Sequence, residues 1–301
     1  MSGKMLSLES VSEQLKSTRG VLNLLISSKK ILFGLTVLLA LIVTGVLAPW
    51  ISPYDPNEQT LTRAYLPPFW LSGGDARYLL GTDSLGRDIL SRLIHGASVA
   101  VYVSVTATIL TAAIGVPLGI ASGYLRGKFD EAVMRVVDIW MSFPPVLLAI
   151  TLISILGTGI NNVILAIVVA DWTRFTRVIR SEVLNIRERD FILVAKSIGF
   201  SPLQIMRYEV LPNVIPLITI IATLEMSIAI TVEVLLSYAG LGVKADTPSW
   251  GSMIADGLSY FRLNPWGMLI PLTATIIVIL GLNLLGDGLR ERLDPRLTLT
   301  R

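Results

Sequence analysis

The sequence has no cysteine and a single histidine, His95, among its 301 residues. The first absence excludes disulfides, cysteine-ligated zinc and thiol catalysis, and the second leaves little for a histidine-based metal or catalytic site. We expect His95 to be an interfacial residue. No basic patch interleaved with aromatic residues occurs along the chain, so the sequence does not favour nucleic-acid binding.

Charged residues are scarce and apolar residues are abundant. Hydrophobic residues make up 52% of the chain, charged residues 16%, and the mean hydropathy is +0.68, which is too apolar for an ordinary soluble domain. Six stretches are long enough to span a bilayer. They occupy residues 31–51, 97–124, 132–157, 160–179, 213–237 and 268–285. Because the stretch at 31–51 is longer than a signal-peptide core and follows a long polar segment, we expect no cleaved signal peptide.

Lysine and arginine are distributed unevenly between the two sets of loops. An even number of spans puts both termini on one side, which holds 19 of the 25 basic residues, against 6 on the other. The positive-inside rule then places the termini and the interval 187–216 in the cytoplasm. The sequence predicts an all-α, multi-pass membrane protein with six transmembrane helices and both termini cytoplasmic. Its segments are tails at 1–30 and 291–301, a first helix at 31–51, an extracytoplasmic loop at 52–96 and a core with five more spans at 97–290.

The interval 187–216 is polar overall and carries two helix signals. Phe191, Val194, Ala195 and Ile198 follow helical spacing and predict one apolar face, and Gly199 stands where a helix C-cap needs positive φ. A second helix is predicted from residue 202, because the sequence at 201–204 combines a serine N-cap, a proline at the first helical position and a glutamine three residues after the cap. The sequence therefore predicts a short helical hairpin.

This helix-glycine-helix pattern, followed by Leu211-Pro212, resembles the EAA loop of ABC importer permeases. Ala195 and Gly199 stand at the family's spacing, whereas 193–194 and Glu209 depart from its pattern. The resemblance implies that the hairpin docks onto a cytoplasmic ATPase subunit. The residues assigned to this coupling are Ala195, Lys196, Gly199, Phe200, Ser201, Leu211 and Pro212. The alternative is an amphipathic hairpin lying on the membrane surface.

Small residues mark one face of the second span. Gly115, Gly119 and Gly123 recur every four residues and predict close packing of another helix.

Polar side chains mark the fifth span. Ser227, Thr231, Glu233 and Ser237 fall on one arc of the predicted helix. Because an ionisable group at membrane depth is costly and usually faces the bundle interior or a water-filled path, this face is a candidate pathway lining. A buried acid satisfied by neighbouring helices is an equal alternative for Glu233. Asp138 in the third span is interpreted as structural.

The end of the sixth span, at 283–296, is similar to the terminal signature of the dipeptide/oligopeptide/nickel importer branch. Further matches lie at 81–88, at Asp138 with 143–144, at 241–242 and at 247–251. The resemblance implies one half of a permease heterodimer in the prokaryotic inner membrane, working with a second homologous permease subunit, two ATPase subunits and an extracytoplasmic binding protein. It implies uptake of di- or oligopeptides by alternating access. Glutathione, opines, nickel complexes and sugars are alternative substrates of such relatives.

The nearest approach to a phosphate loop, at 123–129, has a glycine spacing one residue short and no Ser or Thr after Lys128. We therefore expect ATP and Mg²⁺ to bind in partner subunits, and this chain to bind no cofactor or metal and to be no enzyme itself. A secondary transporter or channel acting alone is the rival hypothesis. That class would favour an internal repeat or paired intramembrane charges, and no clear repeat is present.

Overall fold

The computed structural model describes residues 28–293, and in this part of the chain the regular elements are all helices, with no β-strand. The long helices are α3 (Lys29–Ile51), α4 (Ile89–Leu125), α7 (Ile160–Arg187), α10 (Leu211–Tyr238) and α12 (Trp266–Leu293). The shorter ones are η1 (Leu61–Arg63), α5 (Gly127–Met141), α6 (Pro145–Leu156), α8 (Asp190–Ser197), α9 (Pro202–Ile205), η2 (Met206–Val210) and α11 (Trp250–Ser259). The predicted tails lie mostly outside the described residues.

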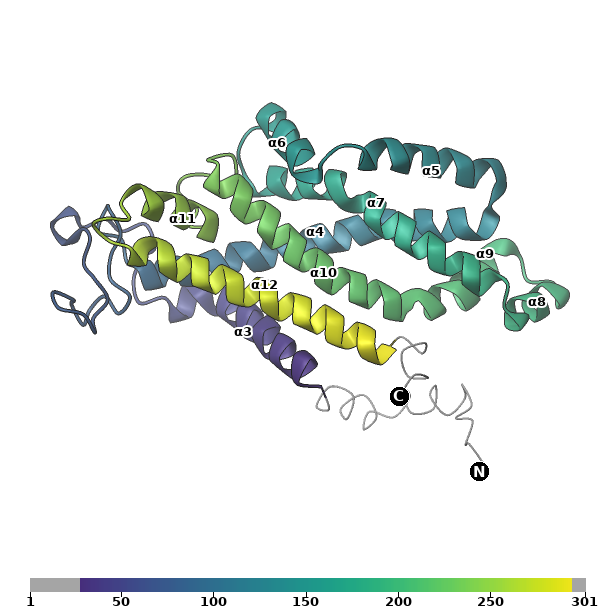
Figure 1. Ribbon diagram of the computed structural model, residues 1–301, viewed down its shortest axis with the longest axis horizontal. Helices are drawn as coiled ribbons and strands as arrows, with labels where there is room; N and C mark the ends of the chain where they lie inside the picture. The colour runs from purple at the N-terminus through teal and green to yellow at the C-terminus, as the bar shows by residue number, and fades with distance from the viewer. Residues whose placement is uncertain (1–27, 294–301) are drawn as a thin grey trace, which may run out of the picture.

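The long helices run along the length of the molecule (Figure 1). By length and composition, four described helices are apolar enough to cross a membrane: α3, α4, the continuous stretch Pro202–Tyr238 and α12. The pair α5 and α6 counts as a fifth if it forms one bent span. α7 has 28 residues but is not among these helices, and it carries Asp171, Arg174 and Arg177 within its length.

The third predicted span is not one straight helix, which corrects the expectation of a continuous segment at 132–157. α5 and α6 meet at an angle of 83°. The cause is local, because Pro144 has extended backbone angles and Pro145 opens α6, and neither residue has an N–H to continue the helix. Trp140 donates a hydrogen bond of 2.6 Å to the carbonyl of Val169 and holds this bend against α7.

The second predicted span begins earlier than expected. Residues 89–96, assigned to the preceding loop, form the first two turns of α4, and Asp88 caps the helix by accepting a hydrogen bond from the N–H of Ser91. α4 has 37 residues and is therefore about 55 Å long, whereas α3 has 23 and spans about 35 Å, close to the hydrocarbon thickness. Helix α4 must extend beyond the apolar layer that α3 crosses.

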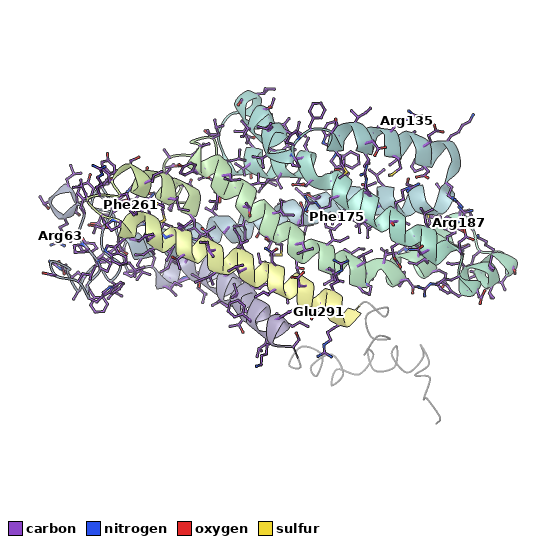
Figure 2. The ribbon with its side chains drawn as sticks, in the orientation of Figure 1. Arg63, Arg135, Phe175, Arg187, Phe261 and Glu291 are labelled. Carbon is purple, nitrogen blue, oxygen red and sulfur yellow. The ribbon has the colours of Figure 1, made fainter. Side chains whose placement is uncertain are left out.

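The two ends of the molecule differ in what they carry (Figure 1). The segment between α3 and α4 lies with α11 at one end, which we call the loop end, and α8 and α9 lie at the other, the hairpin end. The start of α3 and the end of α12 lie together, since the Nζ atom of Lys30 is 2.5 Å from the Oε1 atom of Glu291. The view with side chains places Arg63 and Phe261 at the loop end and Arg187 at the hairpin end (Figure 2).

Buried apolar residues form three clusters, of which two share the loop-end halves of α4 and α10 and the third lies toward the hairpin end. The loop-side cluster includes Leu41, Ile89, Trp250 and Leu282. The central cluster includes Val103, Ala107, Val168 and Ala229. The hairpin-side cluster includes Val116, Phe175, Ile192, Ile205 and Ile221. α10 lies at the centre of this arrangement, because it contacts α4, α7, α11 and α12.

Candidate functional site

The hairpin forms as its sequence predicts. α8 covers Asp190–Ser197, and Gly199 follows with a φ of +89°. α9 begins at Pro202 and has a capping box, in which the Ser201 hydroxyl accepts from the Gln204 N–H and the Gln204 side chain accepts from the Ser201 N–H. The predicted C-cap glycine, proline position and capping box are all confirmed.

The predicted single apolar face of the hairpin is divided between two surroundings, which corrects that expectation. Ala195 is buried in the hairpin-side cluster together with Ile192, because these two positions of α8 face the ends of the long helices. Val194 and Ile198 point away and are 58% and 66% exposed, and Leu203 on α9 is 71% exposed. The hairpin is thus anchored by one apolar surface and presents another.

The remaining predicted coupling residues occupy different positions around this hairpin. Phe200 is 38% exposed, Pro212 is exposed, and Leu211 is half-buried where α10 begins. Lys196 lies with its Nζ atom 5.7 Å from the centre of the Tyr124 ring. These residues therefore do not form one surface, and Ala195 faces the chain's own core.

Tyr124 connects the hairpin to the ends of α4 and α7. Its ring is 7% exposed and has Lys196 of α8 near it, and the guanidinium carbon of Arg187 lies 5.9 Å from the ring centre. Arg187 also donates a hydrogen bond of 2.9 Å to the backbone carbonyl of Tyr124, at the C-terminal end of α4. Tyr124 therefore joins α8, through Lys196, to α4 and, through Arg187, to the end of α7, by contacts that are partly cation–π in kind.

The three glycines of the second span lie against α7. An added Cβ atom would stand 2.5 Å from the Cβ of Phe175 at Gly115, 2.7 Å from the carbonyl of Thr176 at Gly119, and 2.8 Å from the Cβ of Val183 at Gly123. α4 and α7 run parallel here, because the contact advances along both chains together. Any larger residue would force the two helices apart.

The polar face of α10 lies inside this chain. Glu233 is 1% exposed, and its Oε1 atom accepts a hydrogen bond of 2.6 Å from the Ser237 hydroxyl. Ser227 is also buried, and its carbonyl accepts from the Thr231 hydroxyl. The pathway assignment for these residues stays a prediction, and so does the alternative of a buried acid satisfied by neighbouring helices, because Ser237 belongs to α10 itself.

Two other predicted residues have local partners. Asp138 forms an ion pair with Arg177, which joins α5 to α7. The Nδ1 atom of His95 lies 3.0 Å from the carbonyl of Ser91, one turn earlier in α4.

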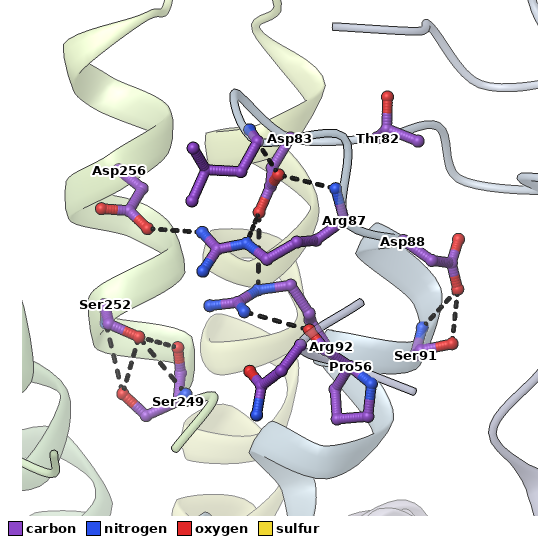
Figure 3. A network of polar contacts seen from close by, with 12 residues as sticks. Pro56, Thr82, Asp83, Arg87, Asp88, Ser91, Arg92, Ser249, Ser252 and Asp256 are labelled. Carbon is purple, nitrogen blue, oxygen red and sulfur yellow. Dashed lines mark hydrogen bonds and ion pairs between the residues drawn. The ribbon is translucent and has the colours of Figure 1, made fainter. Parts of the chain in front are cut away.

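A network of charged side chains at the loop end was missed by sequence reasoning (Figure 3). Asp83 lies 2.6 Å from the Nε atom of Arg87 and 3.6 Å from that of Arg92. Arg87 continues to Asp256 of α11 at 3.2 Å, and Arg92 donates a hydrogen bond of 3.2 Å to the carbonyl of Pro56. Both arginines are buried, at 8% and 2% exposure. The network fastens the loop to α4 and α11.

The same loop contributes the cap of α4. Burial raises the pKa of Asp88, and hydrogen bonds from Ser91 to this carboxyl oppose the rise. Asn264 donates a hydrogen bond of 2.7 Å to the carbonyl of Thr82, which ties the loop to the segment before α12. In the sequence, the signal that could have pointed to this network was the run of residues 81–88, because a polar stretch with two glycines and two acids is unusual beside an apolar span.

Several helices long and apolar enough to cross a membrane define a multi-pass membrane protein. A family profile described as "Binding-protein-dependent transport system inner membrane component" matches residues 115–299. A second profile, "N-terminal TM domain of oligopeptide transport permease C", matches residues 19–68. The chain belongs to the family of binding-protein-dependent transport system inner membrane components, which confirms the predicted resemblance.

Similar proteins cover most of the chain. The "Di/tripeptide transport system permease protein DppC" of Pseudomonas aeruginosa (strain UCBPP-PA14) is 38% identical over 270 residues, 90% of this chain and 89% of that protein. The "Oligopeptide transport system permease protein OppC" of Bacillus subtilis (strain 168) is 35% identical over 271 residues, 90% and 87%. A chain of the inward-facing "MetNI methionine ABC transporter" shares the fold, with a TM-score of 0.57 at 19% identity over 68% of this chain and 98% of that one.

Proposed function

We propose that this chain is the permease subunit of an ATP-driven ABC importer that takes up di- or oligopeptides. The observation that carries the proposal is the hairpin: Val194, Ile198 and Leu203 are exposed on one side, while Ala195 and Ile192 anchor the other side to the long helices. An apolar helical surface of this kind suits docking into a groove of another protein. The names of the similar permeases support a peptide as the substrate.

The topology belongs to the same proposal. Six spans, with α5–α6 and α7 counted as two of them, put both termini and the hairpin in the cytoplasm, as the distribution of basic residues favours. The loop end then faces outward, where an extracytoplasmic binding protein delivers substrate. A second homologous permease subunit completes the pathway, and two ATPase subunits bind ATP and Mg²⁺ and supply the energy.

The mechanism we propose is alternating access. Closure of the ATPase subunits displaces the hairpin, and the contacts of Lys196 and Arg187 with Tyr124 pass that displacement to α4 and α7. The tight packing at Gly115 and Gly123 makes α4 and α7 move as one body. The pathway then opens to one side of the membrane at a time.

Co-purification tests the assembly. A tagged copy of the chain, extracted from its own membrane, is expected to bring down a second permease subunit and ATPase subunits in fixed ratio. Proteoliposomes carrying that complex should then take up labelled dipeptide only with ATP inside and the binding protein outside. Transport by the chain alone, as a homo-oligomer without ATPase subunits, would favour the secondary transporter instead.

The substrate and the topology have tests of their own. Mass spectrometry of the ligand retained by the binding protein is expected to find peptides. Glutathione, an opine, a sugar or a nickel complex there would reassign the cargo and leave the machinery unchanged. Reporter fusions at residue 200 should lie in the cytoplasm and those at residues 70 and 250 outside, and an external position for residue 200 would refute the topology.

A further inference from the structure

A polar layer separates two of the apolar clusters. The central cluster ends at Ala107 on α4 and Val168 on α7, and the hairpin-side cluster starts at Val116 and Phe175 on the same helices. On α10 the corresponding interval is 222–228, between Ile221 and Ala229. The three intervals lie at one level of the bundle, because the three helices contact one another and enter the same two clusters.

Buried oxygen atoms without partners are concentrated in this layer. Glu225 is fully buried, and neither of its carboxylate oxygens has a hydrogen-bond partner among the described residues. The same holds for the Oδ2 atom of Asp171 and for the hydroxyls of Thr108 and Thr111. These five oxygens come from α4, α7 and α10, and native proteins leave few such groups unpaired without a reason.

The groups lie on neighbouring turns of the three helices. Glu225 lies close enough to Asp171 and Arg174 for both to act on it electrostatically. On the other side, Gly115 of α4 packs against Trp172 and the next turn of α7. Thr111 is one turn before Gly115, so it lies at the turn of α7 that carries Asp171.

The charges in the layer do not balance. Arg174 lies 3.5 Å from the Oδ1 atom of Asp171, and it supplies one positive charge to two carboxylates. One unit of negative charge is left inside the bundle, where an uncompensated carboxylate is strongly unfavourable. With both carboxylates ionised, the balance is restored by one added positive charge, which is either a proton or a singly charged cation that oxygen atoms can coordinate.

We propose that Asp171 and Glu225, with the hydroxyls of Thr108 and Thr111, hold one monovalent metal cation, Na⁺ or K⁺. Hard cations take oxygen ligands, and five unpaired oxygens are available. A proton satisfies at most two of them, and a divalent ion would leave an excess positive charge. This site departs from the expectation that the chain binds no metal, and it does not depend on the identity of the transported solute.

The site should act as a clamp between three helices. Its ligands come from α4, α7 and α10, so an occupied site stabilises their packing at the level where the apolar clusters are interrupted. Binding to the folded chain alone raises the melting temperature with ligand concentration. Cation occupancy is therefore measurable as a shift in stability, independently of transport.

Thermal unfolding of the intact complex in lipid nanodiscs tests the proposal. Tm is measured in NaCl, KCl and choline chloride at equal ionic strength, and bound radioactive Na⁺ or Rb⁺ is counted in parallel. We expect a saturable rise in Tm of about 2–4 °C with Na⁺ or K⁺ over choline, and one ion bound per chain. Both signals should be lost in Glu225→Gln and in Asp171→Asn.

Glu233→Gln is the matched control, because Glu233 is a buried acid of the same helix whose carboxylate already accepts from Ser237. It should keep the cation response. Thr111→Val keeps the shape of the side chain and removes one ligand oxygen, so half of the Tm rise should need a several-fold higher cation concentration. This variant tests the site even if Glu225→Gln fails to assemble. Equal Tm in all three salts, or a cation response that survives Glu225→Gln, would overturn the site. A Tm that depends on pH through Glu225 and on no metal cation would assign a proton to this place and would likewise overturn the cation site.

Discussion

Each end of the molecule has a glycine of positive φ, but one glycine is tightly packed and the other lies in open space. At the loop end, Gly86 has a φ of +72°, and a Cβ atom there would collide with the backbone of Thr60. At the hairpin end, Gly199 has a φ of +89°, and no atom lies within 4 Å of the corresponding position. The loop end is filled by the chain itself, whereas the hairpin end leaves its turn free for contact with another protein.

The largest effect is expected at Gly86. Gly86→Ala adds the strain of positive φ, about 1 kcal/mol, and a collision with backbone that cannot move aside. We expect a loss of about 3 kcal/mol or more in total, which should prevent stable insertion. The measurement is the amount and Tm of the chain in membranes. Gly73→Ala is the control, because Gly73 has a φ of +88° in the same loop but its nearest neighbour, Pro67, is 3.9 Å away.

Removing a buried charge should destabilise the loop end nearly as much. Arg92→Met leaves the Pro56 carbonyl without its partner and removes one of the two buried cations beside Asp83, which keeps Arg87, at a cost of about 1–3 kcal/mol. The loss is measured as a lower Tm of the purified complex. Arg77→Met is the control, since Arg77 pairs with Asp75 on the surface and holds its pKa down to about 2 in an exposed position. An unchanged Tm for Arg92→Met would mean that the network does not fasten the loop.

At the hairpin end the same kind of substitution should affect coupling and leave folding intact. Gly199→Val adds strain on the order of 1 kcal/mol at the turn and redirects α9, without any internal collision. We expect normal insertion and Tm, weakened ATPase co-purification and loss of transport. Gly240→Val is the matched control, because Gly240 also follows a helix C-cap, with a φ of +76° and open space around it, but lies away from the hairpin. Normal transport by Gly199→Val would remove the hairpin from the coupling role.

This contrast also explains what sequence reasoning found and missed. The hairpin was predictable because its signals are local: the capping box spans residues 201–204, and Gly199 stands two residues after the end of α8. The loop-end network was not predictable, because Arg87 and Asp256 are 169 residues apart in the chain. Only packing of α11 against the loop brings their charges together.

The membrane spans were predictable only in part, unlike the hairpin and the loop-end network. Apolar runs predicted α3, α4, α10 and α12 well, because hydropathy depends on composition alone. The same measure ignored the pair Pro144-Pro145 and gave one straight span where α5 and α6 bend by 83°. Helical periodicity grouped Ser227, Thr231, Glu233 and Ser237 on one arc and did not single out Glu225, which packing buries close to Asp171 of α7.

A smaller effect is expected where the hairpin meets α4. Tyr124→Leu keeps the apolar volume in the hairpin-side cluster but removes the ring that Lys196 and Arg187 approach. Contacts of this kind contribute about 0.5–1 kcal/mol each, so docking should persist while the ATP hydrolysed per peptide transported rises. Tyr124→Phe, which keeps the ring, should behave as the unmodified chain. If Tyr124→Leu transports with normal stoichiometry, the ring does not transmit the displacement.

The smallest effect is expected from the salt concentration, acting on the contact between the hairpin and the ATPase subunit. The exposed surface of the hairpin is made of Val194, Ile198 and Leu203, and Leu193, 52% exposed, is one of the positions that depart from the EAA-loop pattern. Contact through apolar burial is not screened, whereas exposed ion pairs weaken as the Debye length falls from about 10 Å at 0.1 M salt to about 3 Å at 1 M. We therefore expect ATPase co-purification to fall less than about twofold across that range. Leu193→Glu should make docking steeply salt-dependent, so a steep dependence in the unmodified complex would show that charge, and not apolar burial, holds the hairpin to its partner.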